Sequence, residues 1–96
     1  MEIRVQSIKF DADAKLLEFI DKKVSKLPRF FDGIVSTDVV LSLLQEHDNK
    51  NVKMRVSIPG SEVVVERNAK SFETGINECV DILKDQLTKR KEQMQA

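Results

Sequence analysis

The chain has 96 residues and a mass of 11.0 kDa, a size that supports one domain with a hydrophobic core and not two. A hydrophobic fraction of 41% and a charged fraction of 33% exclude a disordered chain, and no apolar run approaches the ~20 residues of a membrane-spanning helix. Sixteen basic residues balance sixteen acidic ones, and a net charge of zero argues against indiscriminate binding to nucleic acid or to an anionic membrane.

The first third of the chain predicts a strand followed by a helix. Residues 2–9 alternate polar and apolar side chains, and Asp11 or Asp13 can cap the helix that follows. One apolar stripe of this helix is expected at Leu17, Ile20, Val24 and Leu27. The opposite face is expected to carry Lys15, Lys22, Lys26 and Arg29. Pro28 makes continuation of the helix past Leu27 unfavourable.

The middle of the chain predicts three consecutive strands. The first covers residues 34–44 and is expected to place Val35, Val39, Leu41 and Leu43 on one face. A turn over residues 46–51 leads into the clearest alternation of the chain, in which Val52, Met54, Val56 and Ile58 face one way. Residues 59–61 form a tight turn into the strand of residues 61–67.

The last element is a helix that Ser71 is expected to cap. Its apolar stripe is expected at Phe72, Ile76, Cys79, Val80, Leu83 and Leu87. The order β-α-β-β-β-α predicts an α+β fold with a four-stranded sheet, similar to a double-stranded-RNA-binding domain. If the first two strands pair in parallel, both helices run in the same direction and cover one face of the sheet.

Basic residues concentrate at the carboxyl ends of the two predicted helices. Residues 22–29 carry four cations and no anion, and residues 84–91 carry four cations and one anion. Because the helices are expected to be parallel, these two segments should meet in one basic patch. A patch of this kind suits a phosphate backbone. Because phenylalanine is the only aromatic residue, structured RNA fits better than the stacking of single-stranded bases as the main mode of binding. The alternative is that lysines at a helix end simply interact with the helix dipole.

The remaining polar residues offer no catalytic constellation. His47 falls in the predicted turn without a second ligand at metal spacing, and Cys79 lies on the apolar stripe of the last helix. A lone cysteine is typical of a reducing cytoplasm. Gly75 inside a helix indicates a close contact of that helix. We therefore expect a cytoplasmic protein that is not an enzyme and that uses no cofactor, metal or small-molecule substrate.

Two segments resemble the ribosome hibernation promoting factors, a family also called ribosome-associated inhibitors or sigma-54 modulation proteins. Residues 16–34, LLEFIDKKVSKLPRFFDGI, are similar to the first helix of the family and its exit. Residues 76–91, INECVDILKDQLTKRK, are similar to its last helix. The element order and the length agree over the whole chain.

The resemblance implies a cytoplasmic bacterial or plastid protein that binds 16S rRNA of the small ribosomal subunit in the channel for mRNA and tRNA. Occupying this channel stops translation by steric exclusion, and in many members it favours pairing of inactive ribosomes. Carried over by position, the rRNA-binding residues are Lys22, Lys23, Lys26, Arg29, Lys89 and Lys91. Lys84 and Arg90 join this set from local charge alone.

The sequence also departs from the family pattern. Ile82 and Asp85 stand where members often have basic residues, which leaves open a second reading, a protein-interaction module that kept the fold and lost the rRNA site. We expect residues 1–96 to form a single ribosome-binding domain, monomeric when free, without the carboxyl-terminal dimerisation domain of longer members.

Overall fold

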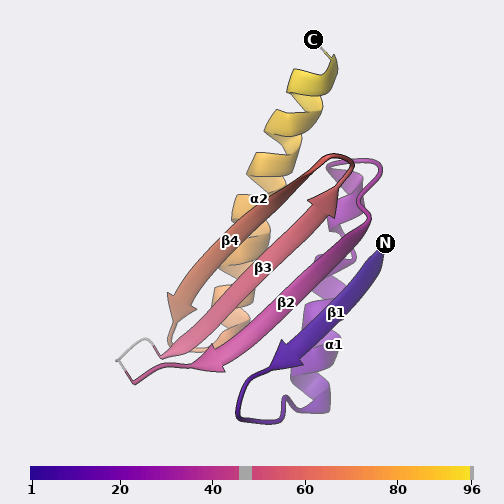
Figure 1. The fold of residues 1–96 in the computed structure, drawn as a ribbon. Helices are drawn as coiled ribbons and strands as arrows, with labels where there is room; N and C mark the ends of the chain where they lie inside the picture. The colour runs from indigo at the N-terminus through magenta and orange to yellow at the C-terminus, as the bar shows by residue number, and fades with distance from the viewer. Residues whose placement is uncertain (46–48, 96) are drawn as a thin grey trace.

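A computed structural model describes residues 1–45 and 49–95 of the chain. Two α-helices, one short 3-10 helix and four strands follow one another along the sequence (Figure 1). Their bounds are β1 (Glu2–Ser7), α1 (Ala14–Val24), η1 (Leu27–Arg29), β2 (Ser36–Leu43), β3 (Lys50–Ile58), β4 (Ser61–Ala69) and α2 (Phe72–Gln95). The predicted β-α-β-β-β-α order is confirmed, and the fold is of the α+β class.

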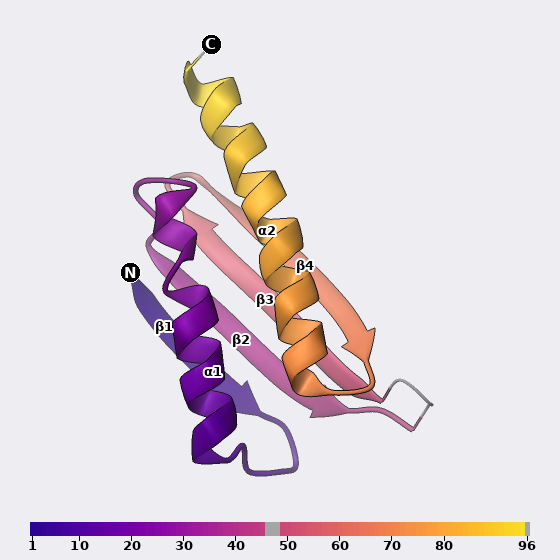
Figure 2. The ribbon, with the colours of Figure 1, turned by 180° about the vertical axis from the view of Figure 1, so that it is seen from behind.

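The strands form one sheet in the order β1-β2-β3-β4. β1 and β2 are parallel, with Val5 opposite Val39, and the β2–β3 and β3–β4 pairs are antiparallel. A parallel first pair requires a crossover, which α1 provides. Both helices cover the same face of the sheet and run in the same direction, as predicted (Figure 2).

The core lies between this covered face and the two helices. Alternate residues of each strand point into it, and Val52, Met54, Val56 and Ile58 are all buried as predicted. The covered side of α2 contributes Ile76, Cys79, Leu83 and Leu87, which are fully buried. Burial of such side chains stabilises the fold by roughly 1.5–3 kcal/mol each.

The predicted stripe of α1 was wrong at one position. Leu16 is buried, whereas Leu17 is 42% exposed; Ile20, Val24 and Leu27 are buried as predicted. Spacings of three and four residues both match a helical face, and the start of the helix decides between them. The Asp13 carboxylate accepts a hydrogen bond from the Leu16 amide at 2.8 Å, and this cap turns Leu16 toward the sheet.

The exit of α1 is tighter than predicted. The α-helix ends at Val24, and the chain then forms η1, in which Pro28 occupies the first turn. Phe31 is buried in the core, whereas Phe30 is only half-buried. The 3-10 turn thus brings Phe30 and the basic residues around it to the surface beside α2.

Three strand predictions need correction at their ends. β2 is shorter than residues 34–44, and Val35 and Leu43 are 60% and 48% exposed rather than buried with Val39 and Leu41. β1 ends at Ser7 rather than residue 9, and β4 continues to Ala69. The predicted turn is shorter because β3 already begins at Lys50. His47 lies outside the described residues.

The beginning of α2 is fixed by a cap and by a close contact. The Ser71 hydroxyl accepts a hydrogen bond from the Thr74 amide at 3.2 Å, as predicted. At Gly75, a Cβ atom would lie 2.8 Å from Cγ2 of Val52, so only glycine lets α2 pack this closely on β3. Gly75 thus permits the first turn of α2 to pack closely on β3.

Within the described residues, no helix combines the length and the apolar character needed to cross a membrane.

Candidate RNA interface

The two helices differ in how far they extend along the sheet. α2 has 24 residues, about 36 Å of helix, and Leu87 is the last fully buried side chain among those of residues 72–93. The carboxyl-terminal turns of α2 project beyond the edge of the sheet (Figures 1 and 2). The molecule is accordingly elongated, measuring 44 × 24 × 19 Å along its principal axes. The carboxyl end of α1 therefore lies beside the middle of α2 and not beside its end.

A groove of about 200 Å³ runs between the exit of α1 and this middle part of α2. Four of the predicted binding residues line it, from both helices. The α1–η1 side contributes Lys23, Lys26, Arg29 and Phe30, and the α2 side contributes Asn77, Val80, Asp81 and Lys84. We call these eight residues the helix groove. It joins the end of the first basic segment to the start of the second.

Two aromatic rings lie under ammonium groups of this region. Nζ of Lys84 lies 5.2 Å from the centroid of the Phe30 ring, and Nζ of Lys23 lies 5.5 Å from that of Phe19. A cation over an aromatic face is stabilised by about 0.5–1 kcal/mol at an exposed site. The Phe30 contact links α2 to η1 and holds the Lys84 amine at the groove.

The cations of the helix groove carry charge that the protein does not neutralise by contact. Within residues 1–45 and 49–95, every ion pair involves Arg4, Arg55 or Arg67, and none involves the four groove cations. Asp81 is the acidic residue of the groove lining, and it too has no ion pair in the described part of the chain. Unpaired surface cations remain available for an external anion.

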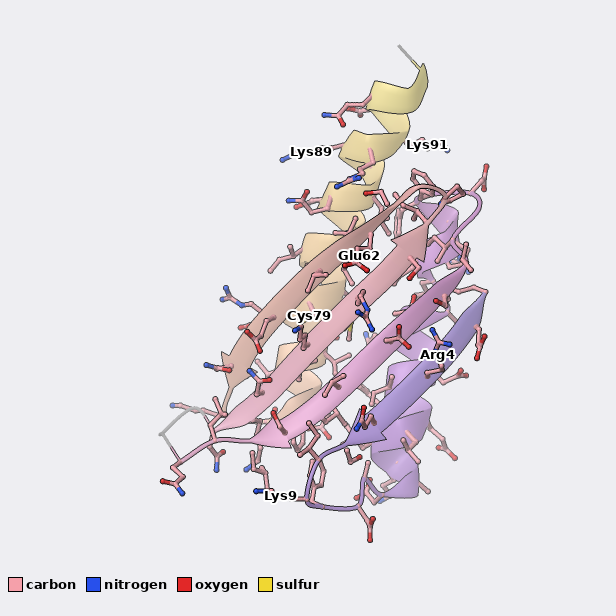
Figure 3. All side chains as sticks on the ribbon, viewed as in Figure 1. Arg4, Lys9, Glu62, Cys79, Lys89 and Lys91 are labelled. Carbon is pink, nitrogen blue, oxygen red and sulfur yellow. The ribbon has the colours of Figure 1, made fainter. Side chains whose placement is uncertain are left out.

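The other predicted binding residues lie elsewhere. Lys22 is exposed but does not line the groove. Lys89 and Lys91 are exposed on the projecting end of α2 and extend to different sides of it, since two residues span just over half a helical turn (Figure 3). The eight predicted residues therefore form a groove with a basic extension rather than a single compact patch.

Arg90 makes a contact that the sequence did not indicate. Its Nη1 donates a hydrogen bond to the Ser61 hydroxyl at 2.8 Å, at the start of β4, and the side chain is half-buried. This contact ties the projecting end of α2 to the β3–β4 turn. Arg90 is thus engaged within the fold, whereas Lys89 and Lys91 have no ion pair among the described residues.

The two departures from the family pattern also have defined positions. Ile82 is partly buried and packs against the hydrophobic core, so an apolar residue there stabilises the packing of α2 on the sheet. Asp85 is exposed and lies outside the groove lining. It adds negative charge one helical turn from Asp81 and next to Lys84.

The open face of the sheet, which the helices do not cover, carries ion pairs between its basic and acidic side chains. Arg4 donates to both carboxylate oxygens of Asp38 at 2.6 and 3.2 Å, and Arg55 lies 3.7 Å from the same carboxylate (Figure 3 labels Arg4). The Arg4 hydrogen bond lowers the pKa of Asp38, and the same contact raises the pKa of Arg4. A hollow of about 340 Å³ on this face is lined by acidic and basic side chains together, among them Asp38, Lys53, Arg55 and Glu66.

The described residues offer little for catalysis. No group of three or more metal-ligating side chains occurs within residues 1–45 and 49–95. Cys79 is fully buried, and burial raises the pKa of its thiol to about 12, so it is held as an unreactive thiol. The chemistry that this surface supports best is the binding of an anion by the helix groove.

Comparisons with known proteins show the family of this chain. The family described as "Sigma 54 modulation protein / S30EA ribosomal protein" matches residues 3–95. A relative from Azotobacter vinelandii named "Ribosome hibernation promoting factor" is 27% identical over 92 residues, which cover 96% of this chain and 84% of that protein.

Solved structures show the same fold. The N-terminal domain of Thermus thermophilus Protein Y aligns with a TM-score of 0.81 at 27% identity, over 93% of this chain and 98% of that one. A ribosomal subunit interface protein from Coxiella burnetii aligns with a TM-score of 0.83 over 96% of this chain and 99% of its own, at 23% identity, which is a likeness of fold. Because the family match spans both helices and the whole sheet, the chain belongs to the sigma 54 modulation protein / S30EA ribosomal protein family.

Proposed function

We propose that this protein is a bacterial ribosome hibernation factor that binds 16S rRNA of the small ribosomal subunit in the cytoplasm. It occupies the channel for mRNA and tRNA and inhibits translation by steric exclusion, without turnover. The observation that carries the proposal is the helix groove, in which Lys23, Lys26, Arg29 and Lys84 meet without intramolecular ion pairs among the described residues. Family membership and the relative named for ribosome hibernation support it.

The arrangement of the cations suits a folded RNA. Phosphates on an RNA surface are met by several cations spread over a rigid scaffold, and each contact releases counterions. The groove supplies a cluster, and Lys89 and Lys91 carry positive charge further along the projecting helix. A protein 44 Å long can thus contact phosphates that are far apart along the RNA chain.

The test is co-sedimentation with bacterial ribosomes over a series of salt concentrations. The variant carries four charge reversals, Lys26→Glu, Arg29→Glu, Lys89→Glu and Lys91→Glu. We expect it to lose ribosome binding while its circular dichroism spectrum and melting temperature stay close to wild type, because all four side chains are exposed. A folded variant that still sediments with ribosomes would contradict the proposal.

A matched control distinguishes the effect of reversing these particular cations from the effect of changing the net charge. Lys9, Lys15, Lys53 and Lys70 are exposed lysines outside the groove lining, and their reversal to glutamate changes the net charge by the same amount. We expect this control to keep most of the ribosome binding. Pairing of inactive ribosomes would appear in the same gradients as a faster-sedimenting species that forms only with the protein present.

The second candidate is a protein-interaction module of the same fold with a weakened rRNA site. The exposed carboxylate of Asp85 beside Lys84 favours it, because it reduces the local positive potential. This candidate predicts weak ribosome affinity and a shallow dependence of RNA binding on salt. A steep loss of binding as salt rises would count against it.

A further inference from the structure

The lining of the helix groove includes apolar, amide and carboxylate groups in addition to the cations that would bind a phosphate. Phe30 and Val80 give it half-buried apolar surface, and Asn77 and Asp81 place an amide and a carboxylate one helical turn apart on α2. A phosphate gains nothing from apolar surface, and the Asp81 carboxylate repels it. These four residues offer apolar surface and hydrogen-bonding groups that a phosphate would not use and that a ligand with a flat apolar face and donor groups would use.

A nucleobase matches these residues. An unpaired base stacks on an aromatic face and forms hydrogen bonds through its edge, which is the usual way in which proteins read single-stranded positions of RNA. A carboxylate accepts hydrogen bonds and donates none, so it selects a base edge that carries donors. Guanine presents two neighbouring donors, its N1–H and its 2-amino group, whereas adenine presents an acceptor at N1.

The geometry points to a binding site for one unpaired guanine nucleotide in the helix groove. The base lies against Phe30 and Val80, and its N1–H and 2-amino groups donate to the Asp81 carboxylate, with Asn77 beside them. Lys84 moves from the face of the Phe30 ring and, with the groove cations Lys23, Lys26 and Arg29, holds the phosphate. The inference rests on the proposed function for an rRNA source of the nucleotide; a free guanine nucleotide has the same chemistry.

The first experiment is an NMR titration of the isotope-labelled protein with 5′-GMP and, separately, with 5′-AMP and inorganic phosphate. We expect GMP to shift the amide signals of residues 29–30 and 77–84 with a Kd on the order of 1 mM, about tenfold tighter than AMP. Asp81→Asn should abolish this preference. Asp85→Asn removes the same charge one turn further along α2, outside the groove lining, and should leave the preference intact.

Two outcomes would overturn the inference. If GMP, AMP and phosphate shift the same amides with equal affinity and Asp81→Asn tightens all three, the groove binds phosphate and Asp81 is only a repelling charge. If GMP causes no shifts up to about 10 mM, no nucleotide site exists there.

Ribosome binding then identifies the source of the nucleotide. If the guanine belongs to rRNA, Asp81→Asn weakens co-sedimentation several-fold without changing its salt dependence, since no phosphate contact is lost. If GMP binds as expected but Asp81→Asn co-sediments like wild type, the ligand is a free guanine nucleotide. The charge-reversal experiment above tests the proposed function independently of either result.

Discussion

The helix groove and the open face of the sheet carry similar kinds of side chain and use them differently. On the open face, Arg4 and Arg55 share the carboxylate of Asp38, so these three charges are satisfied within the protein. In the groove, four cations and Asp81 lie together with no ion pair among the described residues. A net charge of zero hides this difference, because it adds the paired charges of Arg4, Asp38 and Arg55 to those of a groove whose cations have no ion pair among the described residues. The arrangement of charge, and not its total, distinguishes a binding surface from a structural one.

The largest effect on ribosome binding should come from reversing charge in the helix groove, whereas reversal on the open face should have little effect. Lys26→Glu with Arg29→Glu should weaken ribosome binding by about 100-fold or more, because two phosphate contacts become two repulsions. Lys53→Glu with Arg55→Glu on the open face should change it by less than about threefold. Binding constants from filter or sedimentation assays at one salt concentration measure both. Equal losses in the two variants would remove the distinction between the regions.

The second effect is a loss of stability when the packing of α2 on the sheet is disturbed. Gly75→Ala places a Cβ atom 2.8 Å from Cγ2 of the buried Val52, so α2 has to shift. We expect a loss of about 1–2 kcal/mol in the free energy of unfolding, the cost of overpacking less the helix propensity gained by alanine. Urea unfolding measures it. Adding Val52→Ala should recover less than the full loss, since it removes both the clash and buried apolar contacts.

A smaller effect is the pH dependence of the stability that the ion pairs of the open face contribute. The pKa of Asp38 is lowered in the folded protein, so its contribution to stability is present above the pKa of an unfolded aspartate and is lost as the pH falls through the folded pKa. Asp38→Asn should therefore lower the melting temperature at neutral pH, and this difference should shrink as the pH falls below the pKa of an unfolded aspartate, about 3.9. A melting-temperature difference that persists unchanged at acid pH would show that the ion pairs are not its cause.

The smallest effect should follow from freeing Arg90. Ser61→Ala removes the acceptor of its 2.8 Å hydrogen bond and leaves every charge in place. We expect faster amide hydrogen exchange after residue 87 in α2, and a change in ribosome affinity of less than about threefold. Unchanged exchange rates would mean that the contact does not order the projecting end of α2.

The fold was largely predictable because its periodicities are clear. Alternation over residues 52–58 and the apolar stripe of α2 fixed the covered faces, and the element order led to parallel helices. The errors fall where local patterns have two solutions. Leu16 and Leu17 both match a helical face, and the Asp13 cap selects Leu16. The alternation of the sequence predicts Val35 as a strand residue, but Val35 lies just outside β2 and is exposed.

The candidate site was predictable in its residue types and less so in its layout. Local charge indicated Lys84, and the topology brought it to the exit of α1. Lys89 and Lys91 lie on the projecting end of α2, outside the groove lining, which charge patterns alone could not show (Figure 3). The Arg90–Ser61 contact spans 29 positions of the chain and depends on the β3–β4 turn, so no local pattern reports it. No pattern in the sequence indicated that Phe30 would lie in the groove beneath Lys84.

The most direct test of the central claim is the salt dependence of ribosome affinity after neutralising each region. The groove variant changes Lys23, Lys26, Arg29 and Lys84 to glutamine, and the open-face variant changes Lys53 and Arg55 to glutamine. We predict that the slope of log affinity against log salt becomes shallower by roughly 3–4 for the groove variant and stays as in wild type for the open-face variant. A groove variant with the wild-type slope would contradict the account, since its four cations would then neutralise no phosphates.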